Sequence, residues 1–158
     1  MVNIRDLRQK EFADVARNKK RGLLHLTSRF GKIRTCFKFI KPTDVVLVIY
    51  PKIPIKESWL DEAIICGFDL SNFTFTSTAS LKKHTLGKYD WVIWDEPQEV
   101  LSPKFLSLMS VICKNNKNVI GLSGSLSERT LQVIYQSLGL TVIAEYTTSQ
   151  AIAEGVVT

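Results

Sequence analysis

Short apolar runs are the feature that most constrains the fold of this chain. The clearest are Val45–Tyr50 and Trp91–Trp94, which are too short for buried helices and contain no alternating polar positions. Runs rich in β-branched and aromatic residues are typical of strands buried on both faces of a parallel sheet. Further strands are expected over residues 23–26, 73–76, 118–123 and 141–144. The chain therefore predicts a buried, mainly parallel sheet.

Segments with helical spacing of apolar residues lie between these runs. They cover residues 4–17, 36–40, 55–66, 103–113 and 128–138, and a short helix is expected near residues 77–81. Ser102 and Ser127 are the expected N-caps of two of these helices, and Gly139 is expected to end the last. Strands that alternate with helices predict an α/β fold with helices on both faces of the sheet.

Composition indicates an ordinary globular protein. The length of 158 residues fits one domain, and hydrophobic residues make up 45% of the chain against 23% charged residues. No apolar run approaches a membrane span and no signal peptide opens the sequence, so we expect a cytoplasmic protein without a membrane partner. Cys36, Cys66 and Cys113 show no metal-type spacing and are interpreted as reduced core thiols.

Positive charge is concentrated in the first part of the chain. Residues 1–60 hold 14 Lys and Arg against 5 acids, whereas residues 61–158 hold 7 against 10. The balance is therefore +9 in the first part and −3 in the second. Such an excess indicates a polyanion, either nucleic acid or nucleotide phosphates, or else a solvated basic face.

Two adjacent carboxylates, Asp95 and Glu96, follow the central apolar run directly. In open parallel sheets, ligands bind beyond the carboxyl ends of the strands. One carboxylate there can hold Mg²⁺ through its water shell, and the next can orient or deprotonate an attacking water. The alternative is an ordinary acidic turn in which Asp95 caps the following helix.

Two more polar loops follow apolar runs. Gly31 and Lys32 lie between a strand and a helix, which is the context that a phosphate-binding loop requires. Ser123-Gly124-Ser125 follows the next strand after the acidic pair. We predict that the loops of Lys32, Asp95 and Ser123 meet at one edge of the sheet.

In the order and spacing of these motifs, the sequence resembles the N-terminal RecA-like lobe of a superfamily 2 helicase. The resemblance is to the Asp-Glu-x-His (DEAD/DEAH-like) type found in phages and viruses. It implies a P-loop NTPase motor lobe over residues 1–148 and a linker over 149–158 toward a second RecA-like lobe, in cis or in trans. It also implies ATP and Mg²⁺ as cofactors and nucleic acid as partner, with DNA expected over RNA. A viral protein of this kind would act in the host cytoplasm.

The resemblance also assigns roles to individual residues. Cofactor binding falls to Gln9, Ser28, Arg29, Phe30, Gly31, Lys32 and Ile33. Catalysis falls to Asp95, which would also hold the metal, and to Glu96. Ser123, Gly124 and Ser125 match the motif that couples nucleotide state to strand movement. Contact with the nucleic-acid backbone falls to Lys52 and Thr78.

The phosphate-loop motif departs from the family pattern. Ile33 stands where a Ser or Thr hydroxyl normally binds magnesium, and Thr35 cannot replace it, because two residues along a helix turn to the opposite face. Arg29 stands in place of a glycine, and Gln98 in place of a histidine. We therefore expect that the isolated lobe binds ATP weakly or not at all and shows no turnover. Two alternatives are a non-hydrolysing binding module and a structural subunit that docks on another motor.

Overall fold

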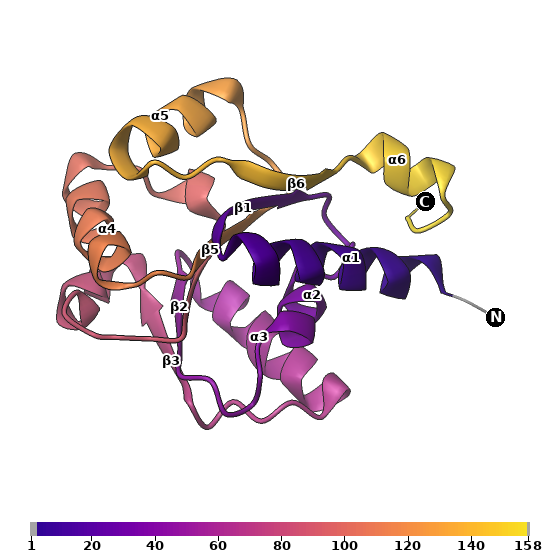
Figure 1. Cartoon of the computed structure of the whole chain (residues 1–158), viewed down its shortest axis with the longest axis horizontal. Helices are drawn as coiled ribbons and strands as arrows, with labels where there is room; N and C mark the ends of the chain where they lie inside the picture. Colours follow the sequence, from indigo (N-terminus) through magenta and orange to yellow (C-terminus); the bar gives the residue numbers. More distant parts are fainter. Residues whose placement is uncertain (1–2, 158) are drawn as a thin grey trace.

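The computed structural model describes residues 3–157, in which a six-stranded sheet carries helices on both faces (Figure 1). The strands are β1 (Arg21–Leu26), β2 (Val46–Tyr50), β3 (Phe73–Ser77), β4 (Trp91–Asp95), β5 (Val119–Ser123) and β6 (Val142–Tyr146). They lie in the order β3-β2-β4-β5-β1-β6, and every neighbouring pair is parallel. The predicted α/β fold class is confirmed.

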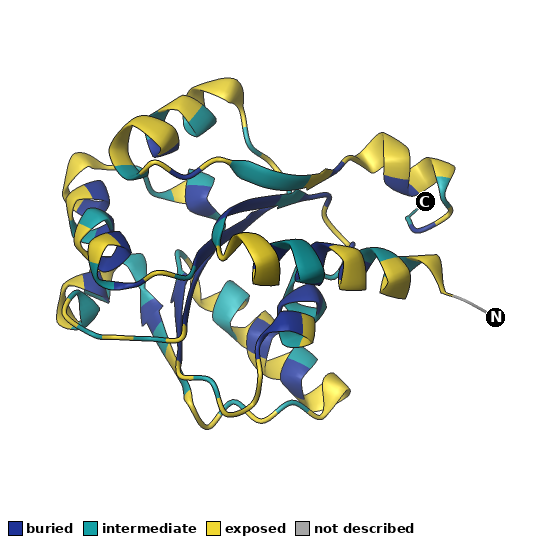
Figure 2. Ribbon diagram, viewed as in Figure 1, coloured by how far each residue is buried: buried dark blue, intermediate teal, exposed yellow. Residues whose placement is uncertain are grey.

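Helices form a layer on each face of this sheet. On one face, α1 (Ile4–Lys19), α2 (Lys32–Phe39), α3 (Ile53–Cys66) and α6 (Thr148–Ala153) enclose one hydrophobic core. On the other, α4 (Pro103–Asn115), α5 (Glu128–Leu138) and the 3₁₀ helix η1 (Thr78–His84) enclose a second core. A short 3₁₀ turn, η2 (Pro97–Glu99), follows β4. Burial is concentrated in the strands and on the helix faces turned toward them (Figure 2).

Local sequence sets most helix ends where they were expected. The Ser102 hydroxyl accepts the Phe105 N–H at the start of α4, and Ser127 caps α5 in the same way. Gly139 ends α5 in the left-handed conformation, with φ of 72°. The difference lies in α2, which begins at Lys32 rather than at residue 36, because Gly31 turns the chain directly into the helix.

Two expectations from composition concern the cysteines and membrane-spanning helices. Cys36 and Cys113 are buried free thiols, but Cys66 at the end of α3 is exposed, so its interpretation as a core thiol is wrong. Across residues 3–157, no helix combines the length and the apolar character needed to cross a membrane.

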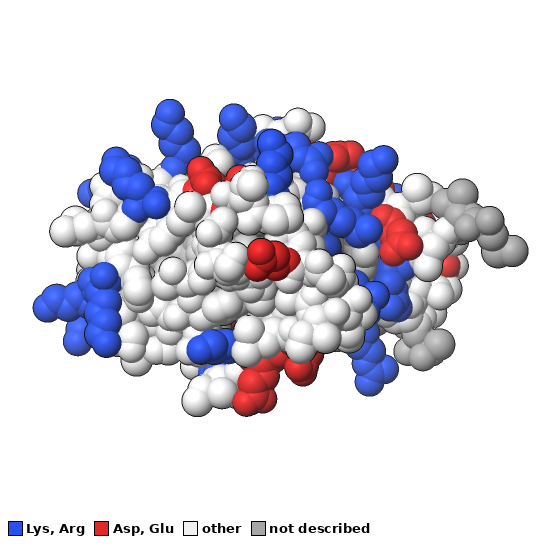
Figure 3. Space-filling view, turned by 90° about the horizontal axis from the view of Figure 1, so that it is seen from below, with Lys and Arg blue, Asp and Glu red and all other residues white. Residues whose placement is uncertain are grey.

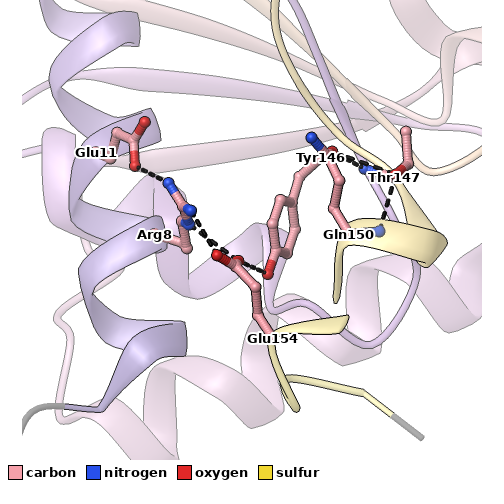
Figure 4. A network of polar contacts seen from close by, with 6 residues as sticks. All are labelled: Arg8, Glu11, Tyr146, Thr147, Gln150 and Glu154. Carbon is pink, nitrogen blue, oxygen red and sulfur yellow. Dashed lines mark hydrogen bonds and ion pairs between the residues drawn. The ribbon is translucent and has the colours of Figure 1, made fainter. Parts of the chain in front are cut away.

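The segment after β6 is folded against the start of the chain (Figure 4). Glu154 accepts two hydrogen bonds from the Arg8 guanidinium, at 2.5 and 3.0 Å, and one from the Tyr146 hydroxyl. The Thr27 and Thr148 hydroxyls lie 2.6 Å apart, which joins α6 to the loop after β1. Residues 149–157 of the predicted linker thus pack on the lobe, while Met1, Val2 and Thr158 lie outside the described residues.

Candidate functional site

The three predicted loops meet at the carboxyl edge of the sheet. β1, β5 and β4 are neighbours in the sheet, so Lys32, Ser123 and Asp95 follow strands that lie side by side. The loops after β1 and β5 are in close contact: a Cβ placed on Gly124 would lie 3.1 Å from both Leu26 O and Ser28 N. The prediction that these loops share one edge is confirmed.

The loop between β1 and α2 has the backbone shape of an anion-binding turn. Arg29 and Gly31 both adopt positive φ, at 67° and 94°, whereas the Phe30 ring between them is buried in the core. Within the turn the Phe30 N–H donates to Thr27 O at 3.3 Å, and the N-terminus of α2 at Lys32 contributes its dipole toward an anion. Ser28 and Arg29 are exposed at the rim.

Gln9 supports this loop from beneath. Its side chain is buried on α1 and donates from Nε2 to the Phe30 carbonyl oxygen at 2.8 Å. A Cβ on Gly31 would lie 2.4 Å from the same Nε2 atom, so the glycine is needed for this approach as well as for its φ. Among the described residues, Gln9 Oε1 is a buried polar atom without a hydrogen-bond partner.

A continuous polar network links the lysine loop to the other two motifs. The Lys32 ammonium is paired with one Glu96 oxygen, and the Gln98 amide donates to the other. The Ser123 hydroxyl donates to Gln98 Oε1 at 2.7 Å and accepts the Ser125 N–H at 3.0 Å. Glu96 reaches Lys32 from a left-handed backbone conformation, with φ of 54°. A change at Lys32 can therefore reach Ser123 through three direct contacts.

Asp95 lies deeper than Glu96 and is held by an indole group. Its side chain is 3% exposed, and Trp59 of α3 donates from Nε1 to Asp95 Oδ2 at 2.8 Å. Burial raises the pKa of Asp95 to about 6, although the Lys32 ammonium and the Trp59 N–H oppose the rise. The sequence predicts a helix over residues 55–66, which contains Trp59, but does not predict this contact. The available signal was general: a buried indole N–H usually has a hydrogen-bond partner.

Ile33 and Thr35 lie as the sequence predicts. Ile33 is half-buried at the site and packs against the core with its hydrocarbon side chain. Thr35 is fully buried and donates from its hydroxyl to Gly31 O at 2.9 Å, so it offers nothing to the pocket. No hydroxyl therefore occupies the position next to Lys32.

A cavity of about 330 Å³ opens between this loop, α3 and the acidic pair. Its lining includes Arg29, Lys32 and Arg34 as cations and Glu62, Asp95 and Glu96 as acids. Arg34 is paired with Glu62 at 2.5 Å across the mouth, a contact that sequence reasoning did not foresee. Because cations and acids both line it, this cavity suits an anion that displaces a lining carboxylate from its cationic partner.

The residues present fit a phosphate better than a magnesium ion. Loop amides, Lys32 and Arg29 supply donors for an anion. Within residues 3–157, no group of three His, Cys, Asp or Glu side chains could hold a metal. Asp95 has one oxygen bonded to Trp59, and Glu96 is paired with Lys32. A magnesium ion would depend on Asp95, on water and on the phosphates themselves.

The predicted nucleic-acid contacts also lie at the carboxyl edge. Lys52 is exposed at the N-terminus of α3 after β2, with its ammonium 3.8 Å from Glu99. Thr78 begins η1 after β3 and lines a shallow pocket with Ser102 and Lys104. Both therefore lie on the side of the acidic pair away from β1, Lys52 after the neighbouring strand β2 and Thr78 after the edge strand β3.

Comparison with known proteins relates this chain to helicases by its fold. No protein-family model and no curated protein matches the sequence. The SWI2/SNF2 ATPase core of Sulfolobus solfataricus, solved in complex with dsDNA, gives a TM-score of 0.68 at 16% identity, over 82% of this chain and 34% of that one. The helicase domain of Hef from Pyrococcus furiosus gives 0.68 at 14% identity, over 92% and 39%. The chain thus spans under half the length of either structure, and its fold is that of their RecA-like domains.

Proposed function

We propose that this chain is the N-terminal, ATP-binding lobe of a superfamily 2 nucleic-acid helicase or translocase. One observation carries the proposal: Lys32, at the start of the helix after β1, is paired with Glu96 next to the buried Asp95. A lysine and two acids at the edge where parallel sheets bind ligands support a phosphate-binding role for this site. The RecA-like fold supports the same reading.

We expect an ATP phosphate to replace the Glu96 carboxylate as the partner of the Lys32 ammonium. Phosphate binding would transfer the ammonium from Glu96 to the nucleotide and leave the Glu96 carboxylate free. Gln98 would keep that carboxylate oriented as a base toward water. Because Ser123 donates to Gln98, loss of the Lys32–Glu96 pair would also change the surroundings of Ser123. When bound, magnesium would neutralise phosphate charge beside Asp95.

Nucleic acid would run along the same edge, past Lys52 and Thr78, and contact them through its backbone phosphates. DNA is proposed over RNA, in line with the dsDNA bound by the SWI2/SNF2 core. A second RecA-like lobe would complete the nucleotide site, so the lobe alone is expected to show no turnover. Phage or viral origin and a cytoplasmic location remain predictions.

A non-hydrolysing nucleotide- or nucleic-acid-binding module is the alternative function. The hydrocarbon side chain of Ile33, at the position of the usual hydroxyl, favours this alternative. Loss of the hydroxyl ligand weakens magnesium binding more than it weakens the phosphate contacts. In this alternative the Lys32–Glu96 pair would open for a ligand without leading to hydrolysis.

Calorimetric titration with ATP, with and without Mg²⁺, tests the proposal. Parent protein should bind ATP weakly, and Lys32→Ala should abolish binding because it removes the ammonium that is paired with Glu96. Lys38→Ala is the matched control, since Lys38 lies exposed on the same helix away from the cavity. Equal binding by parent and Lys32→Ala would contradict the site. So would absence of binding in both the parent and Ile33→Thr.

A further inference from the structure

Exposed lysines recur along the amino edge of the sheet, opposite the candidate nucleotide site. Lys20 directly precedes β1, Lys41 lies before β2, Lys88 before β4 and Lys117 before β5. These four strands are consecutive in the sheet, in the order β2-β4-β5-β1, and all are parallel. Their amino ends therefore form one row, with neighbouring strands about 4.8 Å apart. The row spans about 14 Å from β2 to β1.

Hydrogen bonds between the loops hold this row in a fixed shape. The Val119 N–H donates to Lys20 O at 3.0 Å, and the Asn116 side chain accepts the Tyr89 N–H at 2.8 Å. Asp90 accepts the Val45 N–H at 2.8 Å and so joins the loop before β4 to the loop before β2. The lysine backbones thus belong to one rigid edge, although their side chains remain free to turn.

The four lysines of this row outnumber the two carboxylates that lie among them, Asp44 and Asp90, so the row keeps an excess of positive charge. All four lysines are exposed, and none takes part in the ion pairs found within residues 3–157. The nearby carboxylates of Asp44 and Asp90 instead accept backbone N–H groups. Figure 3 shows basic side chains projecting along the rim and at one end of the molecule rather than over its central surface.

We propose that this amino edge, defined by Lys20, Lys41, Lys88 and Lys117, is a second nucleic-acid surface that binds the backbone of a duplex. It is separate from the Lys52 and Thr78 contacts at the opposite edge. Duplex DNA carries about one charge per 1.7 Å of its axis, so about 14 Å of duplex holds about eight phosphates, of which those on one side can face the row. Four mobile ammonium groups on a rigid edge match such a row without reading its sequence.

The surroundings of the row favour a duplex over a single strand or a membrane. Single-strand surfaces combine positive charge with aromatic rings for stacking, but the aromatic residue nearest in sequence, Tyr89, is half-buried. Membrane-surface binding uses the apolar face of an amphipathic helix, whereas these lysines lie in loops or at the left-handed end of α1. With no exposed ring for stacking and no apolar helix face, the four lysines can contact only phosphates. Phosphate contact is the mode of sequence-independent duplex binding.

Fluorescence anisotropy with a labelled 20-base-pair duplex tests this surface. The triple variant Lys41→Gln, Lys88→Gln, Lys117→Gln removes three charges from adjacent strands and avoids the left-handed position of Lys20. Each lost phosphate contact lowers the slope of log K against log salt by about 0.9, so the slope should fall by about 2.7. The loss of affinity between about 50 and 200 mM NaCl should then shrink by about 40-fold.

A matched control removes the same charge elsewhere. Lys10→Gln, Lys38→Gln, Arg129→Gln takes three exposed cations from scattered helix positions and should leave most of the slope unchanged. An equal fall in both triples would reduce the effect to net charge and overturn the proposal. Binding of the parent to phosphatidylserine vesicles but not to the duplex would also overturn it. Lys32→Ala separates this surface from the proposed nucleotide site, because it should abolish ATP binding and leave the amino-edge slope intact.

Discussion

Asp95→Asn is the substitution that most directly tests the electrostatics of the site. Asp95 is 3% exposed, and burial raises the pKa of its carboxyl group to about 6 from 3.8. A carboxyl group with a raised folded-state pKa binds a proton more readily in the native protein than in the unfolded chain. The folded state therefore loses stability as pH rises from about 3.8 to about 6, and the loss is complete above that window.

The size of the effect follows from the shift itself. A change of about 2 pKa units, at about 1.4 kcal/mol each, gives roughly 3 kcal/mol of free energy of unfolding. The asparagine side chain stays neutral at every pH, so the variant lacks this contribution. Its second amide hydrogen needs a new partner, but that cost is the same at each pH. The stability of the variant relative to parent should therefore rise by about 3 kcal/mol between about pH 3.5 and pH 7.5.

Urea unfolding at a series of pH values, followed by tryptophan fluorescence, measures this difference. Asp61→Asn, which neutralises an exposed carboxylate on the same helix as Trp59, is the control and should show a smaller pH-dependent difference. Trp59→Phe removes the N–H donated to Asp95 and should raise the pKa of Asp95 further, extending the window upward. A difference between Asp95→Asn and parent that stays constant with pH would refute the reasoning.

Three further changes test other parts of the structure. Ile33→Thr should supply the missing hydroxyl and strengthen Mg²⁺-dependent ATP binding about ten- to a hundredfold by calorimetry; equal affinity in the two proteins would show that Ile33 does not limit the metal site. Gly124→Ala should lower the free energy of unfolding by about 1–3 kcal/mol in thermal melts, because its Cβ meets the backbone of Leu26 and Ser28 at 3.1 Å; an unchanged melting temperature would contradict this close approach. Glu154→Gln should speed amide exchange in α6 with little change in melting temperature, since its ion pair with Arg8 is only half-buried; unchanged exchange would mean that other contacts hold α6.

The fold could be predicted because its local signals agree. Val45–Tyr50 and Trp91–Trp94 are apolar at every position, as strands covered on both faces must be, and β2 and β4 occupy those residues. Capping serines and a terminal glycine set the helix ends independently. The order of the strands could not be predicted in the same way, since pairing depends on contacts between distant segments.

The site could be predicted only where its residues end a strand or lie in the segment that comes after one. Asp95 and Ser123 are the last residues of β4 and β5, Lys32 opens the helix after β1, and the parallel sheet brings all three to one edge. Trp59 reaches Asp95 from the middle of a helix 36 residues earlier, and no local pattern marks such a contact. The basic excess of residues 1–60 was visible in the sequence, but the amino edge also draws Lys88 and Lys117 from the rest of the chain, because its membership depends on which loops precede strands.

The position of β1 in the sheet has a consequence for how the chain folds during synthesis. β1 pairs with β5 on one side and with β6 on the other, so its partners lie about 100 and 120 residues further along the chain. At about 5–20 residues per second, a ribosome needs about 5–20 s to make the first of them. Residues 73–77 and 91–95, by contrast, pair with residues 46–50 soon after all three are made. We therefore expect the β2–β3–β4 part to form first. Until β5 emerges, Leu23, Leu24 and Leu26 have no neighbouring strand to pair with, and their apolar side chains depend on chaperones.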